Sequence, residues 1–511
     1  MSKNKAITFK SYHQNQPFLL PPSLDELIPR DHPVRVVNEV IDSIDITPLE
    51  GQYSSVGSSS YHPKMLLKVL VYGYVTNIYS SRKIESSLKE NIHFMWLSAM
   101  NTPDHNTINR FRSERLKEVL RTLFVQIVQL LASEGLLSLK EISLDGTKIE
   151  ANANRYTFVW GKAIKTNKEK MAKQLDELWQ YAQKVAEQET DTPEPPDFTK
   201  IDKQKVEQTI AQIDALLADK KVDKKIEQKL NYAKKNYPKA IEKYEAQEKL
   251  LAGRNSYSKT DTDATFMRMK EDHLQNGQLK PGYNVQVSAS NQYVVEYTIH
   301  PNPTDTTTLP THLEQYNEDY KQLPEEVTAD AGYGSEQNYQ YLEDNHVAAY
   351  VKYNHFNNQL KKNHLKKNPF AAETLYYNAE RDCYYCSMAQ PMNYIGTIER
   401  KTSTGFTQTI KKYQAQNCNG CPLRGVCHDA KANRTIEINH NLNRHKQIAY
   451  EKLTSEEGIQ RRKKRCVEVE PIFGNIKNNH HFKRFMLRGK AKVEIEFGLL
   501  AIAQNLRKKA G

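Results

Sequence analysis

The 511-residue sequence lacks long apolar segments, a secretion signal and an abundance of cysteine. No run of roughly 18 or more uncharged apolar residues occurs, so we expect no membrane-spanning helix and no membrane partner. The N-terminal segment contains neither the apolar core nor the cleavage site of a signal peptide, so we expect a cytoplasmic protein. Six cysteines in such a chain argue against a disulfide framework.

Basic residues are concentrated near the C-terminal end. Residues 461–511 hold 14 of the 73 Lys and Arg residues and 4 of the 61 Asp and Glu residues, a balance of +10 out of the formal net charge of +12. This concentration predicts a surface that faces a polyanion, and nucleic acid is the leading candidate. A solvated basic tail is the simpler alternative.

The length predicts about three domains at roughly 150 residues each, and the N-terminal one reads as helical. The 29 Tyr and 15 Phe residues, with many aliphatic ones, can fill a large core. Residues 1–137 show helical apolar periodicity. One of their helices carries Arg110, Arg112 and Arg115, which would allow it to dock on DNA. A plain helical bundle with exposed arginines is an equal alternative.

Short apolar segments predict strands in the middle of the chain. Residues 141–151 indicate a strand or a strand pair around a turn. A hairpin is expected over 281–300, and short strands over 327–330 and 347–352. Residues 459–509 again read as helices. Alternation of strands and helices predicts an α/β protein.

Two helical runs interrupt this strand region. Apolar residues over 171–185 recur at spacings of four and three, and those over 206–217 have the same spacing. The proline-rich segment 190–199 separates the two runs. The pattern predicts an antiparallel coiled-coil hairpin, and helical sequence continues to about Leu251.

Three acidic residues stand in unusual surroundings. Asp145 lies within an apolar strand, Asp330 ends a short strand, and Glu470 lies in a basic helical segment. A buried carboxylate needs a partner, either a divalent metal or an arginine. Three converging carboxylates suit two-metal phosphoryl transfer on nucleic acid, because Mg²⁺ prefers oxygen ligands. For any one of them alone, a salt bridge or a turn cap is the simpler interpretation.

Five of the six cysteines lie between Cys383 and Cys427. Cys418 and Cys421 form a pair with two residues between them, and Cys383 and Cys386 form another. Two such pairs are typical of a zinc ribbon. The alternative is a small subdomain with reduced, unliganded thiols.

Several motifs follow one another in a specific order over nearly the whole chain. They are Pro-Asp-His-Asn-Thr-Ile at 103–108, Leu-Asp-Gly-Thr-Lys-Ile-Glu-Ala-Asn-Ala at 144–153, Asp-Thr-Asp-Ala at 261–264, Gly-Tyr-Asn at 282–284, Thr-Ala-Asp-Ala-Gly-Tyr at 328–333 and Val-Glu-Pro-Ile-Phe-Gly-Asn-Ile-Lys at 469–477. With these motifs the chain resembles bacterial insertion-sequence transposases of the DDE type, in the long-form group with a helical N-terminal module and a cysteine cluster.

The resemblance implies a ribonuclease H-like mixed-sheet catalytic core. Its catalytic triad maps to Asp145, Asp330 and Glu470, which would bind two Mg²⁺ ions, with Mn²⁺ as a substitute. Glu468 is a rival for the third position. On a helix residues 468 and 470 point about 200° apart, so only one can face the metals, and we favour Glu470.

The resemblance also selects among the cysteines. It favours Cys386, Cys418, Cys421 and Cys427 as ligands of a structural Zn²⁺, with Cys383 as the spare. His428 is a weaker candidate.

Positively charged residues around Glu470 complete the expected site. Arg465 and Lys477 would position phosphates. The predicted DNA-binding residues are Arg465, Lys477, Lys483, Arg484 and Arg488. Asp261, Asp263 and Asp305 lie in matching motifs and are interpreted as core-supporting or turn residues.

The expected domain organisation has six parts. They are a helical DNA-binding domain (1–137), the first part of the catalytic core (138–160), a coiled-coil hairpin (161–255), the second part of the core (256–355), a cysteine-rich insertion (356–455) and the C-terminal helices carrying Glu470 (456–511).

The expected function is binding of the terminal inverted repeats of an insertion sequence, followed by Mg-dependent strand cleavage and transfer into target DNA. We expect a homodimer in the complex with double-stranded DNA, at the nucleoid when bound. The first alternative is a catalytically inactive DNA-binding protein derived from a transposase. The second is a structural adaptor built on the coiled coil and the zinc module.

Overall fold

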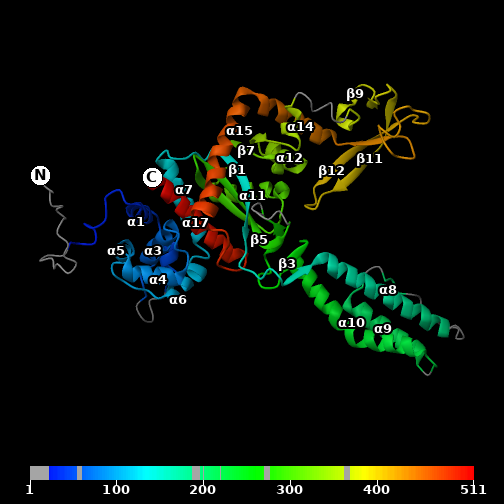
Figure 1. Cartoon of the computed structure of the whole chain (residues 1–511), viewed down its shortest axis with the longest axis horizontal. Coiled ribbons are helices and arrows are strands. Elements are labelled where there is room, and N and C mark those ends of the chain that lie inside the picture. The colour runs from blue at the N-terminus through cyan, green and yellow to red at the C-terminus, as the bar shows by residue number, and fades with distance from the viewer. Residues whose placement is uncertain are drawn as a thin grey trace, which may run out of the picture. The chain divides into compact units, whose positions relative to one another are not determined.

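The computed structural model describes residues 22–53, 60–186, 196–198, 201–218, 220–269, 277–361 and 369–511 (Figure 1). The chain forms two compact units. One runs up to Val119 and includes Asn505–Gly511, and the other is Leu120–Gln504. Within the described residues no helix is both long enough and apolar enough to cross a membrane.

The first unit is helical, as predicted for the N-terminal region. Its helices are α1 (Pro33–Ser43), α2 (Thr47–Glu50), α3 (Pro63–Val75), α4 (Ser81–Glu90), α5 (Ile92–Leu97) and α6 (His105–Arg110), followed by the π-helical turn η1 (Phe111–Arg115). Arg112 is buried and donates to the Tyr79 carbonyl at 2.8 Å, and Arg115 donates to the Gln52 carbonyl at 2.6 Å. Two of the three arginines expected to face DNA therefore hold this unit together instead.

A mixed sheet forms the centre of the second unit, with strand order β4–β5–β1–β7–β8 and β6 also paired with β5. The strands are β1 (Glu141–Glu150), β4 (Thr265–Arg268), β5 (Leu279–Ser290), β6 (Tyr293–His300), β7 (Glu326–Ala329) and β8 (Ala348–Val351). Strand β5 is antiparallel to β1 and β6, whereas β1, β7 and β8 are parallel (Figure 1). The predicted mixed α/β class is confirmed.

Local residue chemistry explains the strands around the centre of this sheet. The predicted hairpin is confirmed as β5 and β6, and Asn291 and Gln292 at its turn have φ values of 50° and 64°. Two central residues with positive φ match a two-residue hairpin turn, and asparagine tolerates that conformation. Residues 141–150 form one strand rather than a pair, because Gly146 continues the ladder opposite Gln286.

Helices and short turns flank this sheet. They are α7 (Leu120–Ser133), η2 (Asp305–Thr307), α11 (Leu309–Tyr320), η3 (Ala331–Tyr333), α12 (Glu336–Asp344), α13 (Phe356–Gln359), α14 (His440–Thr454), α15 (Glu456–Glu468), α16 (Glu470–Gly474), the π-helical η5 (Asn475–Asn479) and α17 (Lys490–Ala510).

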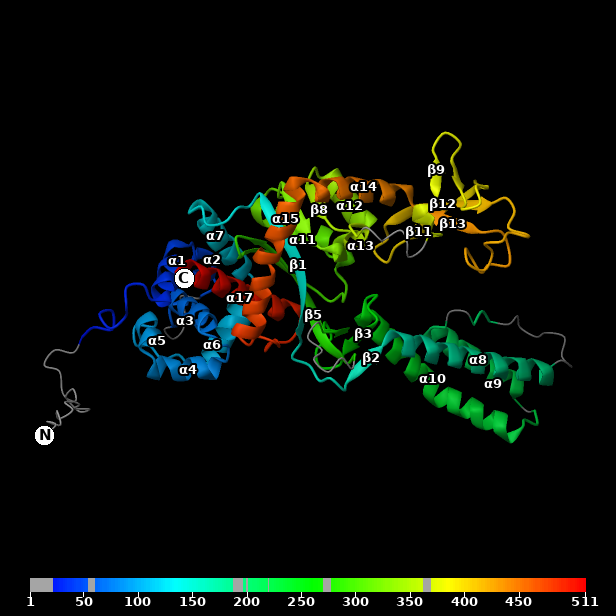
Figure 2. The same cartoon turned by 45° about the horizontal axis from the view of Figure 1, so that its top comes forward.

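The helical insertion contains three helices rather than the predicted hairpin of two. They are α8 (Gly161–Ala186), α9 (Lys203–Leu217) and α10 (Lys224–Leu251), which lie side by side (Figure 2). A two-stranded ribbon, β2 (Phe158–Trp160) with β3 (Ser256–Ser258), connects the insertion to the rest of the unit. Helix α10 adds Leu230, Ala233, Tyr237 and Ile241 to the shared apolar core. Most of the proline-rich segment 190–199 lies outside the described residues.

The cysteine-rich insertion contains a second, antiparallel sheet of order β13–β12–β11–β10–β9, which sequence patterns did not predict. Its strands are β9 (Tyr376–Asn378), β10 (Cys383–Tyr385), β11 (Pro391–Lys401), β12 (Thr407–Ala415) and β13 (Thr435–Ile438), preceded by the turn η4 (Ala372–Thr374). A small apolar core that includes Tyr384, Met392 and Tyr413 supports this sheet.

Candidate functional site

The two predicted catalytic aspartates lie at equivalent positions of neighbouring parallel strands. The last pair in the β1–β7 ladder is Leu144 with Ala329, so Asp145 and Asp330 are the next residues along the two chains. Asp145 is 7% exposed, and its Oδ1 accepts a hydrogen bond from the Gly146 amide at 2.7 Å. Asp330 caps η3 by accepting from the Gly332 amide at 2.8 Å. Strand register thus brings together two carboxylates that are far apart in sequence.

Arg465 on α15 links these aspartates with Glu470. Its guanidinium donates to Asp145 Oδ2 at 3.1 Å and lies 3.8 Å from Glu470 Oε1. Only 8% of the Arg465 side chain is exposed. Burial acts to lower the pKa of Arg465, but the charges of Asp145 and Asp330 outweigh it and the pKa is raised. Arg465 therefore contacts two of the predicted triad residues, Asp145 and Glu470, and the charge of the third, Asp330, contributes to its raised pKa.

The competing residue Glu468 has a different environment. Its carboxylate accepts hydrogen bonds from the Ser143 hydroxyl and from the Asn291 amide, the latter at 3.0 Å, and it is 4% exposed. The Glu470 side chain is 58% exposed. The helix is interrupted at Val469, where α15 ends and α16 begins, so the two glutamates are not separated by a regular helical turn. These contacts favour a structural role for Glu468 and leave Glu470 open to solvent beside Arg465.

Lys352, which the sequence analysis did not single out, follows the next parallel strand at the position equivalent to Asp330. The β7–β8 ladder ends with Ala329 opposite Val351, so Lys352 follows β8 as Asp330 follows β7. Burial is the main cause that lowers the pKa of Lys352, and the nearby Arg465 lowers it further, while Asp330 acts in the opposite direction. Alignment of the carboxyl ends of the three predicted strands would have identified this lysine.

The other predicted DNA-binding residues differ in exposure and contacts. Lys477, in η5, is only 5% exposed. Arg484 donates to the carbonyls of Ala151 and Ala153 at 3.1 Å, and Arg488 donates to the Asn152 carbonyl at 2.9 Å. Both arginines thus brace the segment that follows β1.

Lys483 is an exposed residue of the same segment, as are Arg484 and Arg488. Its backbone carbonyl accepts from the Glu150 amide at 3.3 Å, which ties the segment to the end of β1.

All three other motif aspartates accept hydrogen bonds, Asp305 from the side-chain amides of Asn284 and Gln286. Asp261 accepts from the Tyr283 hydroxyl at 2.9 Å, and Asp263 accepts from the Lys490 amide at 2.8 Å. These contacts agree with the interpretation of Asp261 and Asp263 as supporting residues.

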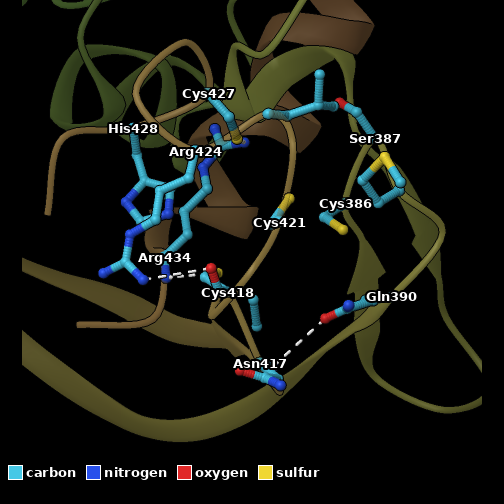
Figure 3. Close-up of a pocket in the computed structure, with 13 residues that line it drawn as sticks. Cys386, Ser387, Gln390, Asn417, Cys418, Cys421, Arg424, Cys427, His428 and Arg434 are labelled. Carbon is cyan, nitrogen blue, oxygen red and sulfur yellow. Dashed lines mark hydrogen bonds between the residues drawn. The ribbon is translucent and has the colours of Figure 1, made fainter. Parts of the chain in front are cut away.

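The four cysteines predicted as zinc ligands line one pocket in the cysteine-rich insertion (Figure 3). His428 lines the same pocket, whereas the spare cysteine, Cys383, lies in β10 and is not part of its lining. Arg434 approaches two of the thiols: its Nη1 lies 3.0 Å from Cys427 Sγ and its amide nitrogen 3.4 Å from Cys418 Sγ.

The carboxylate site and the cysteine pocket offer different donor atoms to a metal ion. Among the residues that the structure describes, no group of three or more His, Cys, Asp or Glu side chains is arranged so that it could hold a metal ion. The carboxylate oxygens around Arg465 are of the type that Mg²⁺ prefers, and the sulfurs of the pocket are of the type that Zn²⁺ prefers. The donor atoms are thus of the expected types, but neither the carboxylates nor the cysteines are arranged in this structure as a metal site.

Two family models match parts of this chain. A family model described as a transposase DDE domain matches residues 385–510, and a model described as a transposase domain matches residues 22–114. Searches of curated proteins and of solved structures found no match. Asp145 and Asp330 lie outside both matched ranges, so their assignment depends on their motifs and on the geometry. The two matches confirm the resemblance of this chain to insertion-sequence transposases of the DDE type.

Proposed function

We propose that this protein binds the terminal inverted repeats of an insertion sequence, cleaves a DNA strand at the element's end and transfers it to target DNA. The observation that carries the proposal is the contact of Arg465 with Asp145 and Glu470, with Asp330 at the end of the neighbouring strand, in a chain with two transposase-domain matches. The central sheet, antiparallel on one side of β1 and parallel on the other, supports a ribonuclease H-like core.

In this proposal Asp145, Asp330 and Glu470 would hold two Mg²⁺ ions, which supply an activated attacking oxygen and stabilise the leaving one. Arg465 stays beside Asp145 and neutralises part of the carboxylate charge that is otherwise costly to bury. Lys352 supplies a second positive charge near Asp330, suited to a DNA phosphate. The 3′-hydroxyl freed by hydrolysis then attacks target DNA in line, without a covalent protein intermediate.

DNA binding is assigned to the basic C-terminal segment and, among its residues, first to Lys483. Its side chain is exposed, and the balance of +10 over residues 461–511 lies on the segment that carries Glu470. We further propose that two copies act together on double-stranded DNA, because an element has two ends to be joined to one target.

We also propose a structural Zn²⁺ held by Cys386, Cys418, Cys421 and Cys427. The support is their shared pocket, from which Cys383 is absent. Four thiolates leave no open coordination position, so such an ion stabilises the insertion and takes no part in DNA cleavage.

Incubation of the full chain with a duplex ending in the inverted repeats that flank its gene tests the function directly. In Mg²⁺ we expect a nick at the element's end that leaves a 3′-hydroxyl, and no nick in EDTA. Specific binding without a nick would favour the inactive DNA-binding alternative. Absence of DNA binding even at low salt would favour the structural adaptor.

A further inference from the structure

Helix α15 packs against the parallel strands of the central sheet, and two of its arginines pair with carboxylates of those strands. Arg461 pairs with Glu141 of β1 and, at 2.8 Å, with Glu326 of β7. Arg465, one turn further along the helix, pairs with Asp145 at 3.1 Å. Each of these two guanidinium groups therefore has a carboxylate partner within the chain.

Arg462, on the same helix, has no such partner. Among the residues that the structure describes, no ion pair of α15 includes Arg462, and its buried Nε has no hydrogen-bond acceptor. Its guanidinium instead lies over the ring of Phe356 in α13, 5.3 Å from the ring centroid. An aromatic face attracts a cation but leaves the N–H donors at the guanidinium edge unused. Arg462 is thus held in place with donors to spare.

Lys352 is a second cation of this kind. It directly follows β8, and its amide donates to the Ala329 carbonyl at 3.2 Å. Tyr350, two residues earlier on β8, interacts with Glu457 of α15. Because alternate residues of a strand point to the same face, Lys352 also points to the face that α15 covers. In the described part of the chain its half-buried ammonium forms no hydrogen bond or ion pair.

Close backbone packing places Lys352 beside the segment of Asp330. A Cβ atom on Gly334 would lie 2.7 Å from the Cα of Tyr353, closer than real Cβ atoms come to a neighbour. Glycine at position 334 therefore lets the turn that follows Asp330 pack directly on the end of β8. Neighbouring strands lie about 4.8 Å apart, so Lys352 is one strand beyond Asp330 and two strands beyond Asp145.

Electrostatic effects agree with this placement. Burial is the largest cause that lowers the pKa of Lys352, and the charges of Arg465 and Arg462 lower it further. The charges of Cys466 and Asp330 act in the opposite direction. Three cations thus lie near one another, and among the described residues only Arg465 has a carboxylate partner. A negative charge from outside the chain would offset their mutual repulsion.

We propose that Lys352 and Arg462 together bind one backbone phosphate of DNA, next to the phosphate that is cleaved. The inference rests on the proposed function, because it takes DNA as the substrate, but it requires no metal ion. A guanidinium edge and an ammonium both donate charge-assisted hydrogen bonds to phosphate oxygens. Since this pair lies one strand beyond Asp330, the phosphate that it binds is a neighbour of the reacting one.

Neutral methylphosphonate linkages, placed one at a time near the end of an inverted-repeat duplex, test this by fluorescence anisotropy in EDTA. At one position beside the cleaved bond, the neutral linkage should weaken wild-type binding about 10-fold or more, as for loss of hydrogen bonds to a charged group. Lys352→Gln and Arg462→Gln should each weaken binding of the unmodified duplex, and should lose no further affinity at that position. Wild-type sensitivity at every position in both folded variants overturns the inference.

Two further variants separate this site from a general effect of charge. Lys352→Arg keeps the positive charge and should keep the wild-type sensitivity to the neutral linkage. Lys452→Gln removes an exposed lysine of α14 and is the matched control, which should also keep that sensitivity. Loss of the sensitivity in Lys452→Gln as well would count against a specific site at Lys352 and Arg462.

Thermal melting covers the case in which Arg462→Gln does not fold. Lys352→Gln removes a side chain without a partner and relieves its repulsion by Arg462 and Arg465, so it should melt at or above the wild-type temperature. A clearly lower melting temperature would show a structural role and contradict the inference. If wild type prefers the repeats to a scrambled duplex but Lys352→Gln keeps every sensitivity, only this inference fails. If wild type shows no such preference, the proposed function fails with it.

Discussion

The carboxylate site and the cysteine pocket each contain an arginine, but the arginine has a different position in each. At the carboxylate site Arg465 pairs with Asp145 and Glu470 and is itself buried. In the cysteine pocket Arg434 lies at the wall, with one nitrogen 3.0 Å from Cys427 Sγ. The first arginine balances the charge of the expected catalytic residues, whereas the second contacts only part of its set.

Because of this difference, we expect substitutions at the two sites to have different consequences. The exposed Glu470 can be changed with little effect on folding, whereas a change of Asp145 would leave the buried Arg465 without its nearest carboxylate. The cysteines lie in connections and short strands of a sheet with a small apolar core, so a metal there would contribute to folding itself. Changes at the first place should affect cleavage, and changes at the second should affect stability.

The largest effect is expected from the two glutamates near Val469. Glu470→Gln should lower the rate of end cleavage at least about 10³-fold, equivalent to roughly 4 kcal/mol of transition-state stabilisation, because it removes a metal ligand. Glu468→Gln should cost less than about tenfold in rate but lower the melting temperature, because its carboxylate holds Ser143 and the Asn291 amide. Single-turnover cleavage and thermal melting measure both. If Glu468→Gln cleaved DNA more slowly than Glu470→Gln, the third metal ligand would be Glu468 instead.

In the cysteine pocket we expect a large effect on zinc content and stability rather than on the cleavage rate. Cys418→Ser should lower the zinc content of the purified protein from about one per chain towards zero, and lower its melting temperature. Cys383→Ser is the matched control, since Cys383 is buried but does not line the pocket, and should keep its zinc. Elemental analysis with thermal melting checks the pair. Equal zinc loss in both variants would contradict the ligand assignment.

A smaller effect, on the salt dependence of DNA binding, is expected for the basic residues of the C-terminal segment. Lys483→Ala should make the slope of log K against log salt shallower by about 0.9 on duplex DNA, with an unchanged melting temperature. Arg484→Ala should also lower the melting temperature, because its guanidinium donates to Ala151 and Ala153. Fluorescence anisotropy at several salt concentrations gives the slopes. An unchanged slope for Lys483→Ala would exclude a phosphate contact at this position.

The smallest effect concerns the acid stability of the second sheet. Burial alone would raise the pKa of Asp382, but hydrogen bonds from Lys411, Tyr377 and Tyr413 outweigh it and lower the pKa to about 2. A lowered pKa stabilises the fold above the unfolded-state value of about 3.9 and loses that contribution as pH falls towards 2. The gap in melting temperature between wild type and Asp382→Asn should therefore narrow from pH 4 to pH 2. A constant gap would show that the charge of Asp382 is not involved.

The sequence predicted those parts of the molecule that depend on local pattern. Apolar periodicity and the Asn-Gln turn identified the β5–β6 hairpin and the parallel strands β7 and β8. The motifs singled out Asp145, Asp330 and Glu470, and in the structure Arg465 contacts the first and the last of these.

Features that depend on long-range contacts were missed. Helical sequence was expected to about Leu251, but the third helix was not recognised as part of the shared apolar core, because Pro238 interrupts its apolar spacing. Burial of Arg112 and Lys477 could not be read from their charge, since each depends on neighbours far along the chain. Asp305 was interpreted as a core-supporting or turn residue, and the hydrogen bonds that it accepts from Asn284 and Gln286 agree with a supporting role.

The most direct test of the account is cleavage of an inverted-repeat duplex by Asp330→Ala, measured beside its binding to the same duplex. The variant removes a proposed metal ligand and no positive charge, so end binding should stay within a few-fold of wild type, or about 1 kcal/mol. Strand cleavage in Mg²⁺ should fall below detection. Cleavage at the wild-type rate by a folded Asp330→Ala protein would contradict the assignment of the catalytic centre.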